Sequence, residues 1–155
     1  MKILVIGLDC AAPELLLGDE SLPNIRQLMA LGGYGRLESV IPPITVPAWM
    51  CMATSQDPGS LGAYGFRNAR DRGYDRLEVI DADWFRAVTL WDQIAMQGGT
   101  SVLLGVPPSY PPRRINGVRV GCFLTPDPAA GGYTHPPEVA DEIEELVGRY
   151  PVDVD

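Results

Sequence analysis

The chain has 155 residues, of which 46% are hydrophobic and 21% are charged, a balance typical of one globular domain with a real core. Its net charge of −8 argues against nucleic acid as a partner, because phosphate backbones bind basic surfaces. No apolar run approaches the roughly 20 residues of a membrane span. The three cysteines have no metal-binding spacing, so we expect a cytoplasmic protein with reduced thiols.

The first residues form an apolar run that ends in an acid. Lys2–Leu8 is almost entirely aliphatic, which predicts a strand buried on both faces of a parallel sheet. Asp9 follows directly. Open α/β sheets place ligand chemistry beyond the carboxyl ends of their strands, so Asp9 is a candidate functional residue. The alternative is that Asp9 caps a helical segment starting near Pro13.

A helix and a second strand are predicted next. Apolar spacing over Pro23–Leu31 favours a helix that Gly32 and Gly33 terminate. Gly35–Val40 reads as a shorter strand. No Gly-x-Gly-x-x-Gly pattern follows the first strand, which argues against a flavodoxin-like or nucleotide-binding domain.

A threonine stands at the next corner of the chain. Pro42 and Pro43 stiffen an extended lead-in, and residues 47–53 are apolar enough for a short helix. We therefore expect Thr45 to be the N-cap at a strand-to-helix corner. Free backbone N–H groups and the helix dipole there suit an anion, or a hydroxyl nucleophile activated by a metal or a base. The alternative is that Thr45 only caps the helix.

The irregular segment 61–81 contains a group of arginines. They alternate with acids that can pair with them, so we favour a solvated loop over a site for an anionic substrate. The arginines are Arg67, Arg70, Arg72 and Arg76, and the acids are Asp71, Asp75 and Glu78.

The remaining pattern completes an α/β order. We predict helices over Thr89–Gln97 and Glu138–Gly148, strands over 101–106 and Gly117–Leu124, and a rigid proline loop over 107–112. The fold class is therefore α/β, with a mostly parallel sheet and flanking helices. Candidate groups would gather at the carboxyl ends of the strands, namely Asp9, the Thr45 corner, the 107–112 loop and Asp127.

An ordered set of short motifs resembles the N-terminal portion of the alkaline phosphatase superfamily, in its type I phosphodiesterase and nucleotide pyrophosphatase branch. The motifs are Val5-Ile6-Gly7-Leu8-Asp9, Leu22-Pro23-Asn24-Ile25 with Leu28, Ile41-Pro42-Pro43-Ile44-Thr45-Val46-Pro47-Ala48-Trp49, Asp57-Pro58-Gly59 with Gly62 and Phe66, Leu90-Trp91-Asp92, Val106-Pro107 with Tyr110-Pro111-Pro112, and Gly121-Cys122-Phe123-Leu124-Thr125-Pro126-Asp127.

The resemblance implies a metal-dependent hydrolase of small phosphate esters. Two divalent cations, usually zinc or otherwise manganese, would be expected in the full-length enzyme. Asp9 would ligate the metal that also holds Thr45, and Thr45 would attack phosphorus to form a phospho-threonine. Nucleotide pyrophosphatases carry an asparagine where this chain has Ala48, which leaves the ester class and the substrate-binding residues open.

The resemblance also implies that the site is incomplete. The chain has a single histidine, His135, which we expect in a loop rather than on a metal. We therefore expect residues 1–155 to be one incomplete α/β domain, the N-terminal part of a longer catalytic domain, with weak or absent hydrolysis by itself. The alternative is a non-catalytic binding module that self-associates through an uncovered apolar face.

Overall fold

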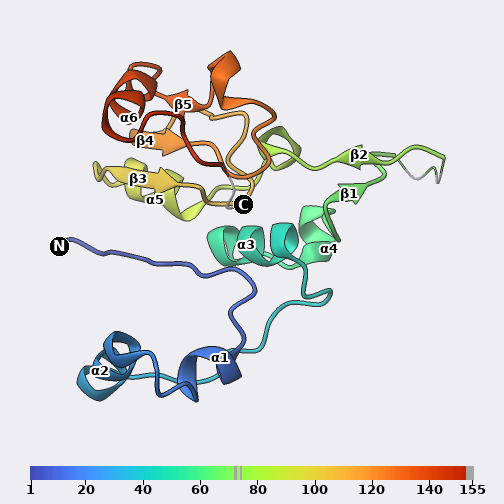
Figure 1. The fold of residues 1–155 in the computed structure, drawn as a ribbon. Helices are drawn as coiled ribbons and strands as arrows, with labels where there is room; N and C mark the ends of the chain where they lie inside the picture. Colours follow the sequence, from blue (N-terminus) through green and yellow to red (C-terminus); the bar gives the residue numbers. More distant parts are fainter. Residues whose placement is uncertain (72, 74, 153–155) are drawn as a thin grey trace. The chain divides into compact units, whose positions relative to one another are not determined.

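The computed structural model describes residues 1–71, 73 and 75–152 (Figure 1). The chain divides into two compact units, Met1–Ser39 and Val40–Asp155. Within the described residues, the first unit carries two helices, and the second carries the other helices and every strand.

The first unit is built on α1 (Pro13–Leu17) and α2 (Pro23–Leu31), which contact each other. Each helix begins with a proline, a residue suited to the first turn because its missing N–H has no intrahelical partner there. The N–H of Gly32 donates to the Leu28 carbonyl at 3.0 Å and ends α2. The predicted bounds of this helix are confirmed.

Two strands predicted in the first 40 residues are wrong. Lys2–Leu8 and Gly35–Val40 are non-helical segments without a strand, and the side chains of Ile3 and Leu4 are 74% and 83% exposed. A strand requires a hydrogen-bonded neighbour, and the apolar composition of a segment does not specify one. Neither segment belongs to a sheet of the described residues.

The second unit opens with α3 (Thr45–Thr54) and α4 (Pro58–Leu61). Ser55 takes a left-handed backbone conformation, φ 56°, where α3 ends. The Oδ1 atom of Asp57 then accepts a hydrogen bond from the Ser60 N–H at 3.0 Å and caps α4. The turn after Thr54 is therefore short, and a second helix follows it at once.

A short hairpin interrupts the arginine-containing segment. Strands β1 (Arg67–Asn68) and β2 (Glu78–Val79) pair antiparallel. Arg70 and Arg76 both form ion pairs with Glu78, at 2.7 and 3.8 Å. This confirms the predicted pairing with local acids for these two arginines, while Arg72 lies outside the described residues.

The larger sheet has three strands, in the order β3-β4-β5 (Figure 1). β3 (Ser101–Leu104) and β4 (Gly117–Val120) run parallel, but β5 (Thr134–His135) pairs antiparallel with β4. The expected α/β class holds, while the expected mostly parallel sheet is mixed. Gly117, φ 134°, is required because a Cβ there would collide with the Ser101 carbonyl.

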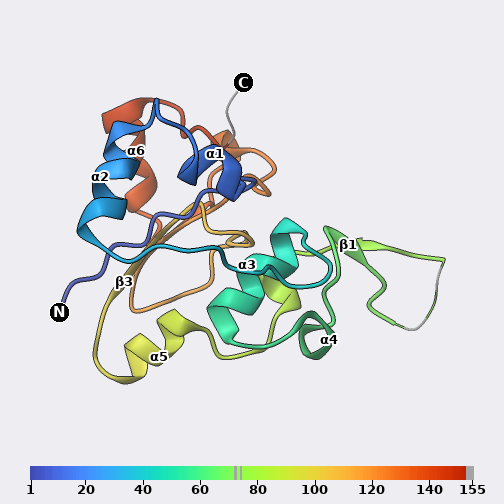
Figure 2. The ribbon, with the colours of Figure 1, turned by 90° about the horizontal axis from the view of Figure 1, so that it is seen from below.

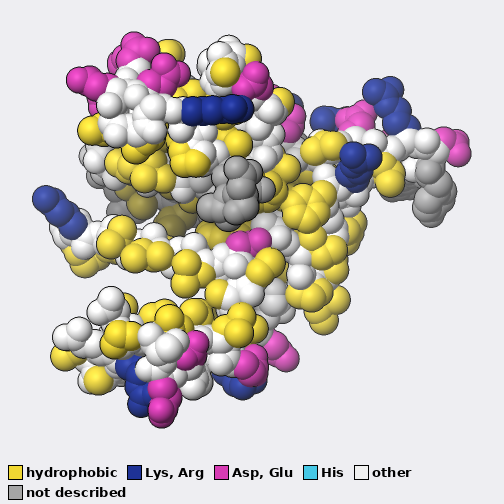
Figure 3. Space-filling view, viewed as in Figure 1, with side chains coloured by type: hydrophobic (Ala, Val, Ile, Leu, Met, Phe, Trp, Pro, Cys, Tyr) yellow, Lys and Arg dark blue, Asp and Glu magenta, His cyan; other side chains and the backbone are white. Residues whose placement is uncertain are grey.

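Helices cover the sheet and connect it to α3. α5 (Leu90–Met96) contacts both α3 and β3 (Figure 2), and α6 (Val139–Val147) contacts β5. The first residue of α5, Leu90, is 55% exposed. The acidic side chains of α6 face solvent (Figure 3). Two 3₁₀ helices complete the unit, η1 (Ala82–Trp84) and η2 (Pro128–Ala130).

The core of the second unit forms where α3 packs on the segment 61–85. Its members are apolar side chains that are almost wholly removed from water, which is the main favourable contribution to folding. They are Val46, Met50, Ala63, Ile80 and Phe85, with Leu61, Trp84 and Leu124 packed against them. Among the described residues, we find no helix both long and apolar enough to cross a membrane.

Candidate functional site

α3 begins at Thr45, so this threonine is the first helical residue rather than the predicted N-cap. Ile44 is the N-cap, with extended backbone angles φ −114° and ψ 144°. The N–H of Ala48 donates to the Ile44 carbonyl at 3.0 Å and closes the first turn. Thr45 is therefore inside the helix rather than before it, because the extended lead-in ends at Ile44.

Buried neighbours fix the start of α3. Val46 and Pro47 are fully buried directly after the threonine, and Met50 follows on the next turn. Thr45 itself is half-buried. Its backbone is thus fixed by core packing while part of its surface reaches solvent.

The first turn of α3 carries positive potential. It contains no acidic side chain, and Pro47 has no N–H to donate. A helix N-terminus carries roughly half a positive charge, which stabilises an anion or an ionising hydroxyl nearby. The local electrostatics at Thr45 therefore suit an oxyanion.

Asp9 lies in an exposed turn of the first unit. Its Oδ2 atom accepts a hydrogen bond from the Cys10 thiol at 3.6 Å. α1 has Ala12 as its N-cap and no side-chain cap, so the alternative that Asp9 caps the segment near Pro13 is wrong. Because Thr45 belongs to the second unit, a metal shared by the two residues stays a prediction.

The 107–112 loop is tied to the segment that packs on α3. The N–H of Ala82 donates to the Tyr110 carbonyl at 2.8 Å. Ser109 is buried, and its hydroxyl donates to the Val120 carbonyl at 3.0 Å. This loop is therefore built into the second unit by backbone contacts.

Asp127 has a structural role in this structure. Its Oδ1 atom accepts from the Ala129 N–H at 2.9 Å and caps η2, and it lies 3.7 Å from the Arg149 guanidinium. These two contacts give the Asp127 carboxylate a role in holding the local structure.

His135 lies on β5 opposite Arg119, so the loop expected for it is wrong. Among residues 1–71, 73 and 75–152, no group of three or more His, Cys, Asp or Glu side chains is placed to hold a metal ion. Asp9 and Thr45 each carry oxygen atoms of the kind that divalent metals bind, and they belong to different units. The described donors do not fit a complete two-metal centre.

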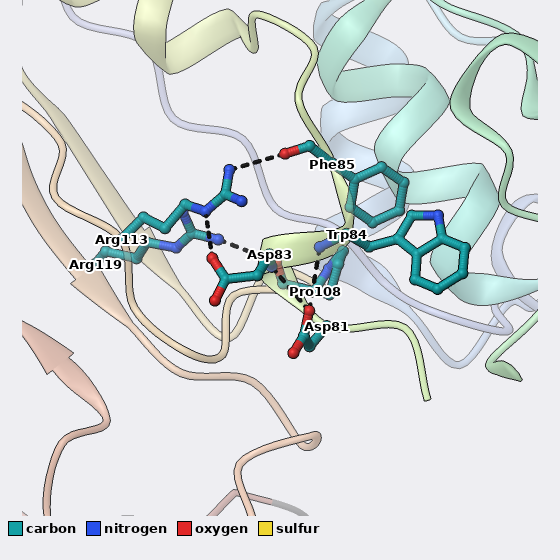
Figure 4. A network of polar contacts seen from close by, with 7 residues as sticks. All are labelled: Asp81, Asp83, Trp84, Phe85, Pro108, Arg113 and Arg119. Atoms are coloured by element: carbon teal, nitrogen blue, oxygen red, sulfur yellow. Dashed lines mark hydrogen bonds and ion pairs between the residues drawn. The ribbon is translucent and has the colours of Figure 1, made fainter. Parts of the chain in front are cut away.

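One residue of functional interest, Arg119, is absent from the predictions. It is 4% exposed on β4, and its Nη2 atom donates to the Pro108 carbonyl at 3.0 Å (Figure 4). Beside it, Arg113 bonds the Asp83 carboxylate and the Phe85 carbonyl, both at 2.9 Å. The available signal was a charged residue between two valines of a predicted strand, since charged residues are rarely buried without a partner.

Comparison with known proteins identifies the family of this chain. The sequence profile described as type I phosphodiesterase / nucleotide pyrophosphatase matches residues 3–154. No curated protein and no solved structure gives a significant match to the chain. The match spans almost the whole chain, including Asp9, the Thr45 corner and the 107–112 loop. The chain therefore belongs to the type I phosphodiesterase/nucleotide pyrophosphatase family, within the alkaline phosphatase superfamily.

Proposed function

We propose that this chain supplies the nucleophile of a metal-dependent phosphodiesterase or phosphatase acting on small phosphate esters. The observation that carries the proposal is the position of Thr45. It is a half-buried hydroxyl residue at the start of a core-anchored helix whose first turn holds no acid, in a chain of the phosphodiesterase family. A role limited to capping does not explain this setting, because Ile44 already occupies the N-cap position.

The reaction is an in-line displacement at phosphorus. The Thr45 Oγ1 atom loses its proton and forms a bond to phosphorus, while the bond from phosphorus to the ester oxygen breaks and the alcohol leaves. Water then cleaves the phospho-threonine and restores the hydroxyl. A hydroxyl is a weak nucleophile at its ordinary pKa, and a divalent cation on it would supply the charge that favours the alkoxide. The positive end of α3 acts in the same direction.

We further propose that Asp9 and Thr45 hold one of two zinc or manganese ions. The other ligands would come from a segment outside these 155 residues, since the chain has one histidine and the described residues hold no metal cluster. The 155 residues alone would then hydrolyse esters weakly or not at all, as one incomplete domain.

Ala48, one turn after Thr45, leaves the substrate class broad. Ala48 lies three positions later on α3, so it shares a face with Thr45. An alanine has no group to hold a phosphate oxygen. The proposal therefore names a phosphate ester without naming a nucleotide.

Kinetics of three forms of the complete gene product test the assignment. With zinc or manganese and a chromogenic phosphodiester, Thr45→Ala is expected to abolish turnover and Thr45→Ser to retain measurable turnover. Thr100→Ala, which truncates an exposed threonine outside the helices, is the matched control and should match the parent. Full activity in Thr45→Ala would show that the nucleophile is another group.

A second candidate function is non-catalytic self-association. The extended segment 2–8 shows a row of hydrophobic side chains (Figure 3), and Val102 and Leu104 of β3 are 66% and 67% exposed. Exposed apolar surface of this kind favours association of copies. Sedimentation velocity over a concentration series discriminates: a reversible dimer supports this reading, and a monomer at high concentration contradicts it.

A further inference from the structure

A cavity of about 60 Å³ lies in the second unit, away from Thr45. It adjoins a wider hollow of about 640 Å³, because both are lined by Ala87, Asp92, Arg113, Arg114 and Ile115. One water needs roughly 15 Å³ of such space. The cavity therefore has room for a small polyatomic ion, with an open approach beside it.

Arg119 brings a buried positive charge to this cavity. Its guanidinium lies 5.9 Å from the centre of the Trp91 ring, and its buried Nε atom has no hydrogen-bond partner in the described part of the chain. Among the described residues, no carboxylate lies within ion-pair distance of it. Burial, followed by repulsion from Arg113, lowers the pKa of Arg119. A buried charge without a counter-ion is costly, so this arrangement favours an anion in the cavity.

The walls of both hollows are unusually basic for this chain. Four arginines line them, whereas the protein as a whole carries a net charge of −8. Arg113 is held in place by Asp83 and the Phe85 carbonyl, which presets the orientation of its guanidinium. The four are Arg86, Arg113, Arg114 and Arg119.

The Asp92 carboxylate determines which kind of oxyanion the cavity can bind. Its Oδ2 atom accepts from the Thr89 N–H at 2.8 Å and from the Thr89 hydroxyl at 2.6 Å, while its Oδ1 atom receives no hydrogen bond from the described residues. A carboxylate beside an arginine repels a fully ionised oxyanion and accepts a hydrogen bond from a protonated one. Hydrogen phosphate carries such an O–H at neutral pH, whereas sulfate does not.

We propose that the cavity lined by Arg119 and Asp92 binds a phosphate group, either inorganic phosphate or the monoester end of a small molecule. Arg119 and Arg114 donate to its oxygens, and Asp92 accepts from the P–OH group of hydrogen phosphate or of a monoester in its singly ionised form. The α3 residue at the cavity is Met50, about 7.5 Å along the helix axis from Thr45 at 1.5 Å per residue. The site is thus separate from Thr45 and stands whether or not Thr45 is a nucleophile.

Equilibrium dialysis of the 155-residue protein with radiolabelled inorganic phosphate tests the proposal. Binding is measured directly because phosphate and sulfate also stabilise proteins non-specifically. We expect one phosphate per chain, competed by unlabelled phosphate and much less by sulfate. Competition by glycerol phosphate, with its organic part in the wider hollow, identifies a monoester as the ligand, and competition by inorganic phosphate alone identifies the free ion. Equal competition by sulfate, or no binding, would overturn the proposal.

Three variants locate the bound phosphate. Arg119→Met should weaken binding by about tenfold or more, the scale of a lost charge-assisted hydrogen bond. Arg70→Met is the matched control, because Arg70 also lies over a tryptophan, 4.9 Å from the Trp84 ring centre, but does not line the cavity. It should bind as the parent does. If Arg119→Met fails to fold, the exposed Arg114→Gln decides instead, and parental binding in the variant that folds would contradict the site.

Discussion

The backbone N–H of Ala82 donates to the carbonyl of Tyr110 at 2.8 Å. This bond joins the proline loop after β3 to the segment whose Ile80 and Phe85 pack against α3. Residues far apart in the sequence are thereby fixed around the helix that begins with Thr45. The position of the candidate nucleophile consequently depends on this core. Substitutions in the core can be made, and their effect on the free energy of unfolding can be measured.

Substitution of Ile80 tests how much that core contributes to stability. Ile80 is fully buried against α3, whereas its neighbour Val79 is 51% exposed. Ile80→Ala should lower the free energy of unfolding by about 2–5 kcal/mol, because it removes buried methyl groups and leaves a cavity. Urea denaturation measures the loss, and Val79→Ala, as the control, should change stability by less than about 0.5 kcal/mol. Equal losses in the two variants would contradict the packing described here.

Substitution of Thr89 tests whether its side chain caps the start of α5. Its hydroxyl accepts from the Asp92 N–H at 3.3 Å, and Asp92 accepts in return from the Thr89 N–H. Thr89→Ala should lower the unfolding free energy by about 1 kcal/mol, within the usual range for a lost N-cap. Thr100→Ala truncates an exposed threonine outside the helices and should be neutral. An equal effect of both substitutions in urea denaturation would exclude a capping role.

Tyr133 and Tyr150 form a matched pair. Their rings stack at 5.1 Å. The buried Tyr133 hydroxyl has no hydrogen-bond partner among the described residues, while the Tyr150 hydroxyl donates to the Gly121 carbonyl at 3.0 Å. Tyr133→Phe should raise the unfolding free energy by up to about 1 kcal/mol, and Tyr150→Phe should lower it by about 0.5–1.5 kcal/mol. Chemical denaturation at pH 7 would contradict this if Tyr133→Phe were the destabilising change.

The raised pKa values of the same two tyrosines predict that the protein loses stability at alkaline pH. Burial, followed by nearby negative charges, raises the pKa of Tyr133, and burial also raises the pKa of Tyr150. The unfolded chain then ionises first, near pH 10, so their contribution is intact below that pH and is lost as pH rises towards the folded pKa. Unfolding free energies measured from pH 8 to 11 should fall above about pH 10, and less steeply in Tyr133→Phe. An unchanged slope in that variant would contradict the assignment.

The sequence predicted the helices better than the sheet. Pro23–Leu31 and the Thr89-capped helix have local signals, namely a terminating glycine, a capping threonine and helical spacing. Lys2–Leu8 has only apolar composition, and a strand also needs a pairing partner that no local pattern specifies. The antiparallel β5 was missed for the same reason, since two residues leave no periodicity to detect.

The candidate site was predicted in part. Thr45 was found because prolines and an apolar helix frame it, and its offset by one position reflects how little the sequence fixes a helix boundary. Arg119 was missed because its significance depends on burial and on a cavity formed with Asp92 and Trp91. Those properties arise from tertiary packing of a strand against a helix.

Trapping of the intermediate tests the central claim most directly. The complete gene product, mixed with zinc or manganese and an aryl phosphate ester, would be quenched in acid within one turnover and digested with trypsin. Mass spectrometry should then find a phosphoryl group on Thr45, in the peptide 37–67, and Thr45→Ala should show none there. A phosphoryl group on another residue, or hydrolysis by Thr45→Ala at the parental rate, would contradict Thr45 as the nucleophile.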